Sequence, residues 1–282
     1  MKTLKFILVA LAVSFATNVS AQTADELAEM ATKEKQAQLT VTVDEIINSY
    51  FENTGGIENW EKIEGLKMFA KVNNGGMEIP IEITQLKSGK QMTVINFQGK
   101  EIKQGVFDGE TLWSTNFMTQ KAEKSDAETT ANFKNELNDF PDPFLNYKEK
   151  GYTVELLGNE DIDGTPTFKI KLVKEPVTID GNLEDDVTFY FFDTENFVPI
   201  AMHKEIKQGQ SKGMISEITF SDYQEVGNIY MPFSMTQGVK GQAGQPITME
   251  KIELDPEVDD KAFMFPEETE AEDKNDGNDN KN

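Results

Sequence analysis

Alternation of apolar and polar residues over short segments restricts the fold of this chain more than any other feature. The segment 77–84 reads MEIPIEIT, in which every second residue is large and apolar. A two-residue period places such residues on one face of a β-strand. Further apolar segments follow at 92–97, 152–158 and 213–220, and short glycine-containing turns separate them. The pattern predicts about eleven antiparallel strands, connected mostly as a meander.

An antiparallel sheet of this size curls because its strands twist. Segment 187–192 is apolar on both faces, since Phe189 and Phe191 face one way and Tyr190 and Phe192 the other. The predicted fold class is therefore mainly β with inserted helices (α+β). It is a strongly curved antiparallel sheet, or incomplete β-barrel, with helices covering its concave face.

A helical period replaces the alternation between residues 42 and 63. Thr42-x-x-Glu45 has the spacing of a capping box, and the double glycine at 55–56 predicts a left-handed helix end. A short second helix, 57–63, follows and carries Trp60. The apolar face of the first helix consists of Ile46, Ile47, Tyr50 and Phe51.

A third helix is predicted over residues 126–139. Ser125-x-x-Glu128 has the spacing of a capping box, and prolines at 141 and 143 end the helical pattern. Its apolar side carries Phe133, Leu137 and Phe140.

The ends of the chain differ in composition from its middle. Two lysines, an apolar run at 6–15 and the small residues Val19 and Ala21 predict a secretory signal peptide over 1–21. A polar helical spacer is expected over 22–42, the folded domain over 43–266, and a disordered acidic tail over 267–282. The chain has no cysteine, which excludes disulfides and a lipid anchor on an N-terminal cysteine.

The charge is strongly acidic. The basic residues are 27 lysines without any arginine, against 50 acidic residues, and the formal net charge is −23. Nucleic acid is excluded as a partner because phosphate contacts need a basic face. Such a charge favours solubility and discourages adhesion to anionic lipid surfaces.

Chemistry-bearing motifs are absent from the sequence. His203 is the only histidine, it is expected at a partly exposed strand position, and a zinc site needs several such ligands. Gly209-Gln210-Ser211-Lys212-Gly213 matches the sequence pattern of a nucleophile elbow. It joins two predicted strands, however, whereas the elbow requires a turn from a strand into a helix. Segment 159–164 lacks the closing ligands of a calcium loop. We therefore expect no catalytic residue, no metal, no cofactor and no enzymatic activity.

Apolar residues are abundant instead, with 19 phenylalanines and 12 methionines. Most of them are accounted for by the core. Methionine is also favoured on adaptable binding surfaces, and a curved sheet lined with apolar side chains encloses space for an apolar ligand. Core filling and a ligand cavity both remain open at this point.

Several motifs occur in an order that resembles the outer-membrane lipoprotein-sorting proteins of the LolA-like family. They are Asp44-x-x-x-x-x-Tyr50-x-x-x-x-Gly55-Gly56-x-x-x-Trp60-x-x-Ile63, Phe107-Asp108-Gly109-x-x-x-Trp113, Gly151-Tyr152-x-Val154-x-Leu156-Leu157-Gly158, Phe192-Asp193, Phe220-x-Asp222-Tyr223 and Phe263-x-Phe265-Pro266. The resemblance implies a soluble, monomeric periplasmic carrier that holds acyl chains of lipoproteins or lipids in a hydrophobic cavity and meets envelope membrane proteins. The alternative is a non-catalytic envelope scaffold or lipoprotein-sensing domain with the same fold.

On this resemblance, the helices at 43–63 form a lid that is packed less tightly than a core helix. Trp60 either lines the cavity or belongs to the core. The family's best-studied carrier uses a lid arginine, whose planar fork lysine does not copy, and this chain lacks arginine. The residues expected at the cavity or lid are Tyr50, Phe51, Trp60, Ile81, Trp113, Phe133, Phe189 and Phe191.

Overall fold

The computed structural model describes residues 41–266. The predicted signal peptide, nearly all of the predicted spacer and the predicted acidic tail lie outside the described residues. Among the helices that are described, none has the length and apolar character needed to cross a bilayer.

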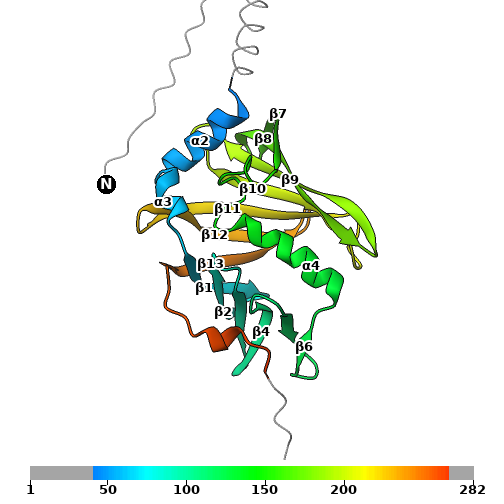
Figure 1. The fold of residues 1–282 in the computed structure, drawn as a ribbon. Helices are drawn as coiled ribbons and strands as arrows, with labels where there is room; N and C mark the ends of the chain where they lie inside the picture. The colour runs from blue at the N-terminus through cyan, green and yellow to red at the C-terminus, as the bar shows by residue number, and fades with distance from the viewer. Residues whose placement is uncertain (1–40, 267–282) are drawn as a thin grey trace, which may run out of the picture. The chain divides into compact units, whose positions relative to one another are not determined.

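A single antiparallel sheet of 13 strands forms the described part of the chain (Figure 1). The strand order is β6-β5-β4-β3-β2-β1-β13-β12-β11-β10-β9-β8-β7. The strands are β1 (Gly65–Asn74), β2 (Met77–Leu86), β3 (Gln91–Phe97), β4 (Lys100–Phe107), β5 (Leu112–Thr115), β6 (Ala122–Lys124), β7 (Thr153–Ile162), β8 (Thr165–Ile179), β9 (Asn182–Asp193), β10 (Pro199–Glu205), β11 (Ile215–Val226), β12 (Ile229–Val239) and β13 (Gln245–Leu254).

The predicted fold class is confirmed. All neighbouring strands are antiparallel, and the sheet stays unclosed because the edge strands β6 and β7 do not pair with each other. The pairing of β1 with β13 joins the first and last strands of residues 41–266 in the middle of the sheet. More strands form than the sequence predicts, since strands as short as β6, with 3 residues, show no alternation.

Two helices, α2 (Val43–Asn53) and α3 (Ile57–Glu61), are packed together as the helical period predicts. The turn between them lies directly on the sheet, where the amide of Tyr230 donates to the carbonyl of Thr54 at 3.0 Å. Gly55 and Gly56 have φ angles of 112° and 89°, so the helix ends at the double glycine with positive φ angles, although the ψ of 139° at Gly56 is extended and not left-handed helical. A Cβ on Gly55 would lie 2.1 Å from the carbonyl oxygen of Asn228, so this close approach requires glycine.

The third helix is shorter than predicted and starts differently. α4 spans Ala127–Glu136 and continues as the 3-10 turn η1 (Leu137–Asp139). The predicted Ser125 cap is wrong, because Asp126 caps the helix and accepts from the amide of Thr129 at 2.7 Å. Glu128 is unavailable for a capping box, since its carboxylate accepts from the backbone amides at 180–181, at the tip of the β8–β9 hairpin.

The C-terminal part of the described chain forms a second core cluster. The 3-10 turn η2 (Asp260–Phe263) buries Phe263 against Val106 and Trp113. The indole of Trp113 donates to the carbonyl of Phe263 at 2.9 Å. Val106 precedes Phe107, whose ring meets α4, so this cluster covers the face of the sheet opposite to α4.

Candidate functional site

One face of the sheet, which we call the inner face, is the face toward the helices. Tyr50 of α2 has its ring centroid 5.7 Å from that of Phe192, and Phe133 of α4 lies 5.1 Å from Phe107. Phe144, from the segment 140–152 that follows α4, also lies against Phe192, at 5.3 Å. Residues paired across antiparallel strands share a face, so these contacts assign the inner face of every strand in register with them.

A continuous apolar surface crosses the inner face from β3 to β10. Ile81 faces inward because it shares a side of β2 with Gln85, which is in register, through Gln91, with Phe107. Most of the side chains on this apolar surface are only half-buried, whereas those of a closed core are fully buried. The half-buried members are Met68, Val72, Ile79, Ile81, Ile83, Ile95, Met202, Ile218, Phe220, Met235 and Ile247.

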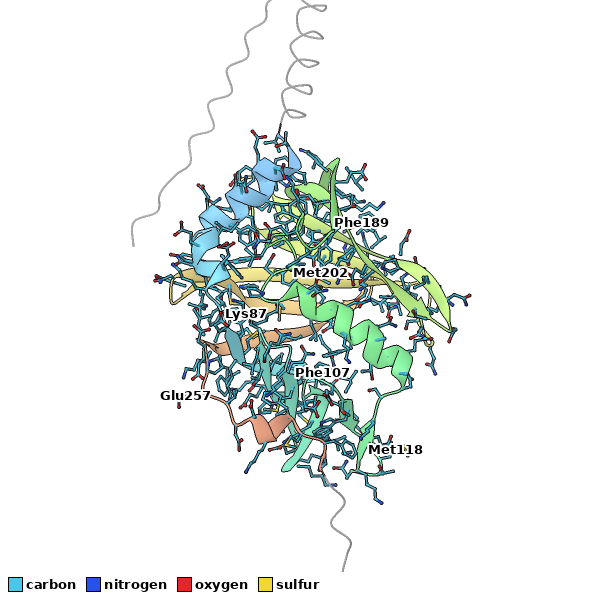
Figure 2. All side chains as sticks on the ribbon, in the orientation of Figure 1. Lys87, Phe107, Met118, Phe189, Met202 and Glu257 are labelled. Carbon is cyan, nitrogen blue, oxygen red and sulfur yellow. The ribbon has the colours of Figure 1, made fainter. Side chains whose placement is uncertain are left out.

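α4 crosses this apolar surface without burying any residue of its own (Figure 1). Figure 2 shows Met202 and Phe107 on the two parts of the sheet between which α4 runs. The helix is held mainly by polar contacts to the β8–β9 hairpin, where the side chain of Asn132 both donates to and accepts from the backbone of Thr178. Phe133 is its only large apolar side chain. α4 is therefore a loosely packed cover.

The expectation that the helices at 43–63 are loosely packed is wrong. Phe51 and Trp60 are 1% and 3% exposed. Their rings meet edge to face at 5.9 Å, and the indole of Trp60 donates to the carbonyl and hydroxyl of Thr54 at 3.2 and 3.1 Å. These helices bury a full apolar face because the turn at Gly55 presses them onto the sheet.

The predicted site residues fall into three places. Tyr50, Phe51 and Trp60 form one aromatic cluster between α2, α3 and the sheet. Ile81 and Phe133 belong to the inner face and its cover. The remaining three lie on the opposite face, where Phe191 packs against His203, Phe189 lies beneath Lys169, and Trp113 packs under the C-terminal segment.

His203 is buried, which corrects the partly exposed position expected from the sequence. Its Nε2 lies 2.7 Å from the carboxylate of Glu217 on β11, and its ring packs 4.5 Å from that of Phe191. Burial lowers the pKa of His203 despite this acidic partner. His203 is therefore a packed residue on the face of the sheet opposite to the inner face, held by its pair with Glu217 and its contact with Phe191.

Two clefts adjoin the inner face. One has a volume of about 650 Å³ and lies between the end of α2, the β9–β10 turn and β11–β12, with Phe220 and Tyr223 in its wall. The other, of about 180 Å³, separates the end of α4 from the β2–β3 turn and includes Gln85 and Leu137.

A polar group lies at the α2 side of the inner face. The carboxylate of Asp142 accepts from the hydroxyl of Tyr50 at 2.9 Å and from the amide of Phe144 at 2.8 Å. Burial raises the pKa of Asp142 to about 6, although both hydrogen bonds and Lys150 act in the opposite direction. Burial and the charge of Asp142 also raise the pKa of Tyr223.

This raised pKa predicts a pH-dependent stability. Because the folded-state pKa of Asp142 lies above the ordinary value near 4, the protonated form favours folding, and this contribution is lost as the pH rises through about 6. We expect Asp142→Asn to remove up to about 3 kcal/mol of the difference in unfolding free energy between pH 4 and pH 7. Urea unfolding across this range measures it.

Glu149→Gln, an exposed change in the same segment, is the control for the loss of one acidic charge. The interpretation fails if Asp142→Asn and Glu149→Gln give the same pH profile.

A chain of partly buried ion pairs connects the segment after α4 to the sheet. Lys174 on β8 lies 2.5 Å from Asp139 and 3.4 Å from Asp186, and Lys204 lies 2.6 Å from Asp186. Burial alone would lower the pKa of Lys174, but the two carboxylates raise it. Sequence reasoning missed this cluster and Asp142, because no spacing along the chain marks residues that meet only through the fold.

Within residues 41–266, no group of three or more His, Cys, Asp or Glu side chains is arranged to hold a metal ion. The acids and bases named above are engaged in structural pairs. The inner face therefore offers apolar contact area and a few hydrogen-bonding groups.

No protein-family model and no curated protein sequence matches this chain. Among solved structures, a DUF1329 family protein from Desulfovibrio piger matches with a TM-score of 0.50 and 13% identity, over 80% of this chain and 98% of that one. A LolA superfamily protein from Nitrosomonas europaea matches with a TM-score of 0.48 and 12% identity, over 80% and 98%. An outer membrane lipoprotein-sorting protein domain from Vibrio parahaemolyticus matches at 0.46 and 11%, over 78% and 94%. At these identities the likeness concerns the fold alone, and it agrees with the unclosed antiparallel sheet with inserted helices that the sequence predicts.

Proposed function

We propose that the protein is a carrier that binds acyl chains of lipids or lipoproteins against the inner face of its sheet. The observation that carries the proposal is the contrast between a half-buried apolar inner face and a cover helix, α4, that buries none of its residues. A closed core leaves no such surface. An acyl chain bound along the inner face would cover the apolar side chains that the protein leaves half-exposed.

The energetics suit this function without catalytic groups. Each methylene buried from water contributes about 0.8 kcal/mol, so a long acyl chain supplies on the order of 10 kcal/mol before the cost of association. Entry needs displacement of α4 alone, since α2 and α3 are packed as core. The proposal includes export to the periplasm, which the features of residues 1–21 favour.

Phe133→Ala tests the proposal. We expect the parent protein to bind a fluorescent fatty acid and the variant to bind it about tenfold more weakly, because truncation removes apolar contact area from the cover. The unfolding free energy should change much less than for a buried aromatic residue. Fluorescence titration and thermal unfolding measure the two effects.

Phe189→Ala is the matched control, because Phe189 is also half-buried but lies on the opposite face. Its fatty-acid affinity should equal that of the parent. Equal losses in the two variants would show that the effect is not specific to the inner face. If the parent protein binds no fatty acid, the carrier function is rejected in favour of the scaffold or lipoprotein-sensing domain.

A further inference from the structure

Six turns lie along the same end of the sheet, because the strands are antiparallel. These turns span 75–76, 98–99, 116–121, 180–181, 206–214 and 240–244, and we call this end the apolar rim. The opposite rim contains the turns at 87–90, 108–111, 163–164, 194–198 and 227–228. Figure 2 places Met118 of the apolar rim and Lys87 of the opposite rim on opposite sides of the view.

Exposed apolar side chains gather at the apolar rim. Met118 is 94% exposed and Phe117 is 57% exposed at the tip of the β5–β6 turn, and Leu183 is 76% exposed beside the β8–β9 turn. The members of this group are Met77, Phe117, Met118, Leu183, Met214 and Ile215. Such a concentration on turn tips is typical of a surface that contacts something apolar.

The turns of the apolar rim carry more lysines than acids, although the chain as a whole is acidic. Four lysines lie in its turns with one acid, Asp180; the lysines are Lys121, Lys207, Lys212 and Lys240. Carboxylates from flanking segments also reach these turns: Glu128 bonds to the amides at 180–181, Glu184 pairs with Lys207, and Glu123 bonds to Asn116. The turns of the opposite rim contain the acids Asp108, Glu110, Asp163 and Glu195 with two lysines, Lys87 and Lys90. In the part of the chain that the structure describes, Lys121 and Lys212 form no ion pair, which leaves their ammonium groups available. Beyond about 10 Å, salt screens the acids elsewhere on the surface.

We propose that the apolar rim docks onto an anionic lipid bilayer, with the tip Phe117–Met118 among the lipids and the rim lysines on the headgroup phosphates. Apolar tips flanked by lysines match the two layers of such a surface. Although the acidic surface as a whole discourages adhesion to anionic lipid, Lys121 and Lys212, which form no ion pair within residues 41–266, offer cationic contacts beside the apolar tips of this rim.

Docking at this rim also orients the proposed ligand site. Burial along β1 decreases from Gly65 and Leu66 at the opposite rim to exposed Asn73 and Asn74 at the apolar rim. The incompletely covered part of the inner face thus lies nearer the apolar rim. The proposal therefore rests on the proposed function, in which acyl chains would pass between bilayer and inner face at this end.

Vesicle flotation tests the proposal with the chain that begins at Gln22, which lacks the apolar run at 6–15. We expect binding to vesicles of phosphatidylcholine with phosphatidylglycerol, little binding to phosphatidylcholine alone, and weaker binding at high salt. The pairs Phe117→Ser with Met118→Ser, and Lys121→Glu with Lys212→Glu, should each reduce binding about tenfold or more.

Ile57→Ser with Lys62→Glu is the control, because both residues are exposed near the opposite rim. It should bind vesicles like the parent. Rim variants that bind as the parent does, or a parent that binds no vesicle, would overturn the proposal; in the second case the exposed tips would more plainly suit a protein partner.

Fatty-acid titration of the same rim variants separates the two proposals. We expect unchanged affinity, since the substituted residues lie outside the inner face. Fatty-acid binding without vesicle binding would reject the rim alone, and vesicle binding without fatty-acid binding would reject the carrier function alone.

Discussion

Gly55→Ala is expected to destabilise the protein by about 4 kcal/mol or more, the range that marks a severe substitution. The added Cβ would lie 2.1 Å from the carbonyl oxygen of Asn228 and 2.8 Å from the Cα of Ile229, both of them backbone atoms that cannot move by a rotamer change. Relief requires α2 and α3 to lift from β12, which breaks the hydrogen bond from Tyr230 to Thr54. Urea unfolding measures the change.

Gly56→Ala separates steric overlap from backbone strain. Gly56 also has a positive φ, of 89°, but a Cβ there meets nothing within 4 Å. We expect a cost of about 1–3 kcal/mol, because φ 89° and ψ 139° define a positive-φ extended conformation that residues other than glycine rarely adopt. Equal costs for the two variants would show that the turn at Gly55 does not lie against β12 as described.

Phe51→Ala is expected to cost about 3–5 kcal/mol of unfolding free energy, as for other well-packed aromatic side chains. The ring is 1% exposed and contacts Tyr50 and Trp60 at centroid distances of 4.9 and 5.9 Å. Its removal leaves a cavity that the rigid sheet does not fill. Chemical denaturation measures the loss, and fatty-acid binding should persist wherever the variant is still folded.

Phe117→Ala makes the same chemical change at a position that is 57% exposed. It should alter the unfolding free energy by no more than about 0.5 kcal/mol. If Phe51→Ala also cost no more than about 0.5 kcal/mol, the helices at 43–63 would be loosely packed, as the sequence predicts, and not part of the core.

Local patterns in the sequence determined the elements and the relative faces of neighbouring side chains. The alternation in 77–84 became β2, the double glycine ended α2, and Phe189 and Phe191 do face away from Tyr190 and Phe192. These predictions succeeded because residue period and glycine conformation act over a few neighbouring residues.

The tertiary structure alone decided which face is the inner one. Phe189 and Phe191 were expected at the cavity, yet their strand turns Tyr190 and Phe192 toward α2 and Phe144 instead. Alternation specifies two faces, but the choice of the concave one depends on contacts with distant segments. Asp142 depends on the fold in the same way, since its partner Tyr50 lies 92 residues earlier and only the packing of α2 on the sheet brings them together.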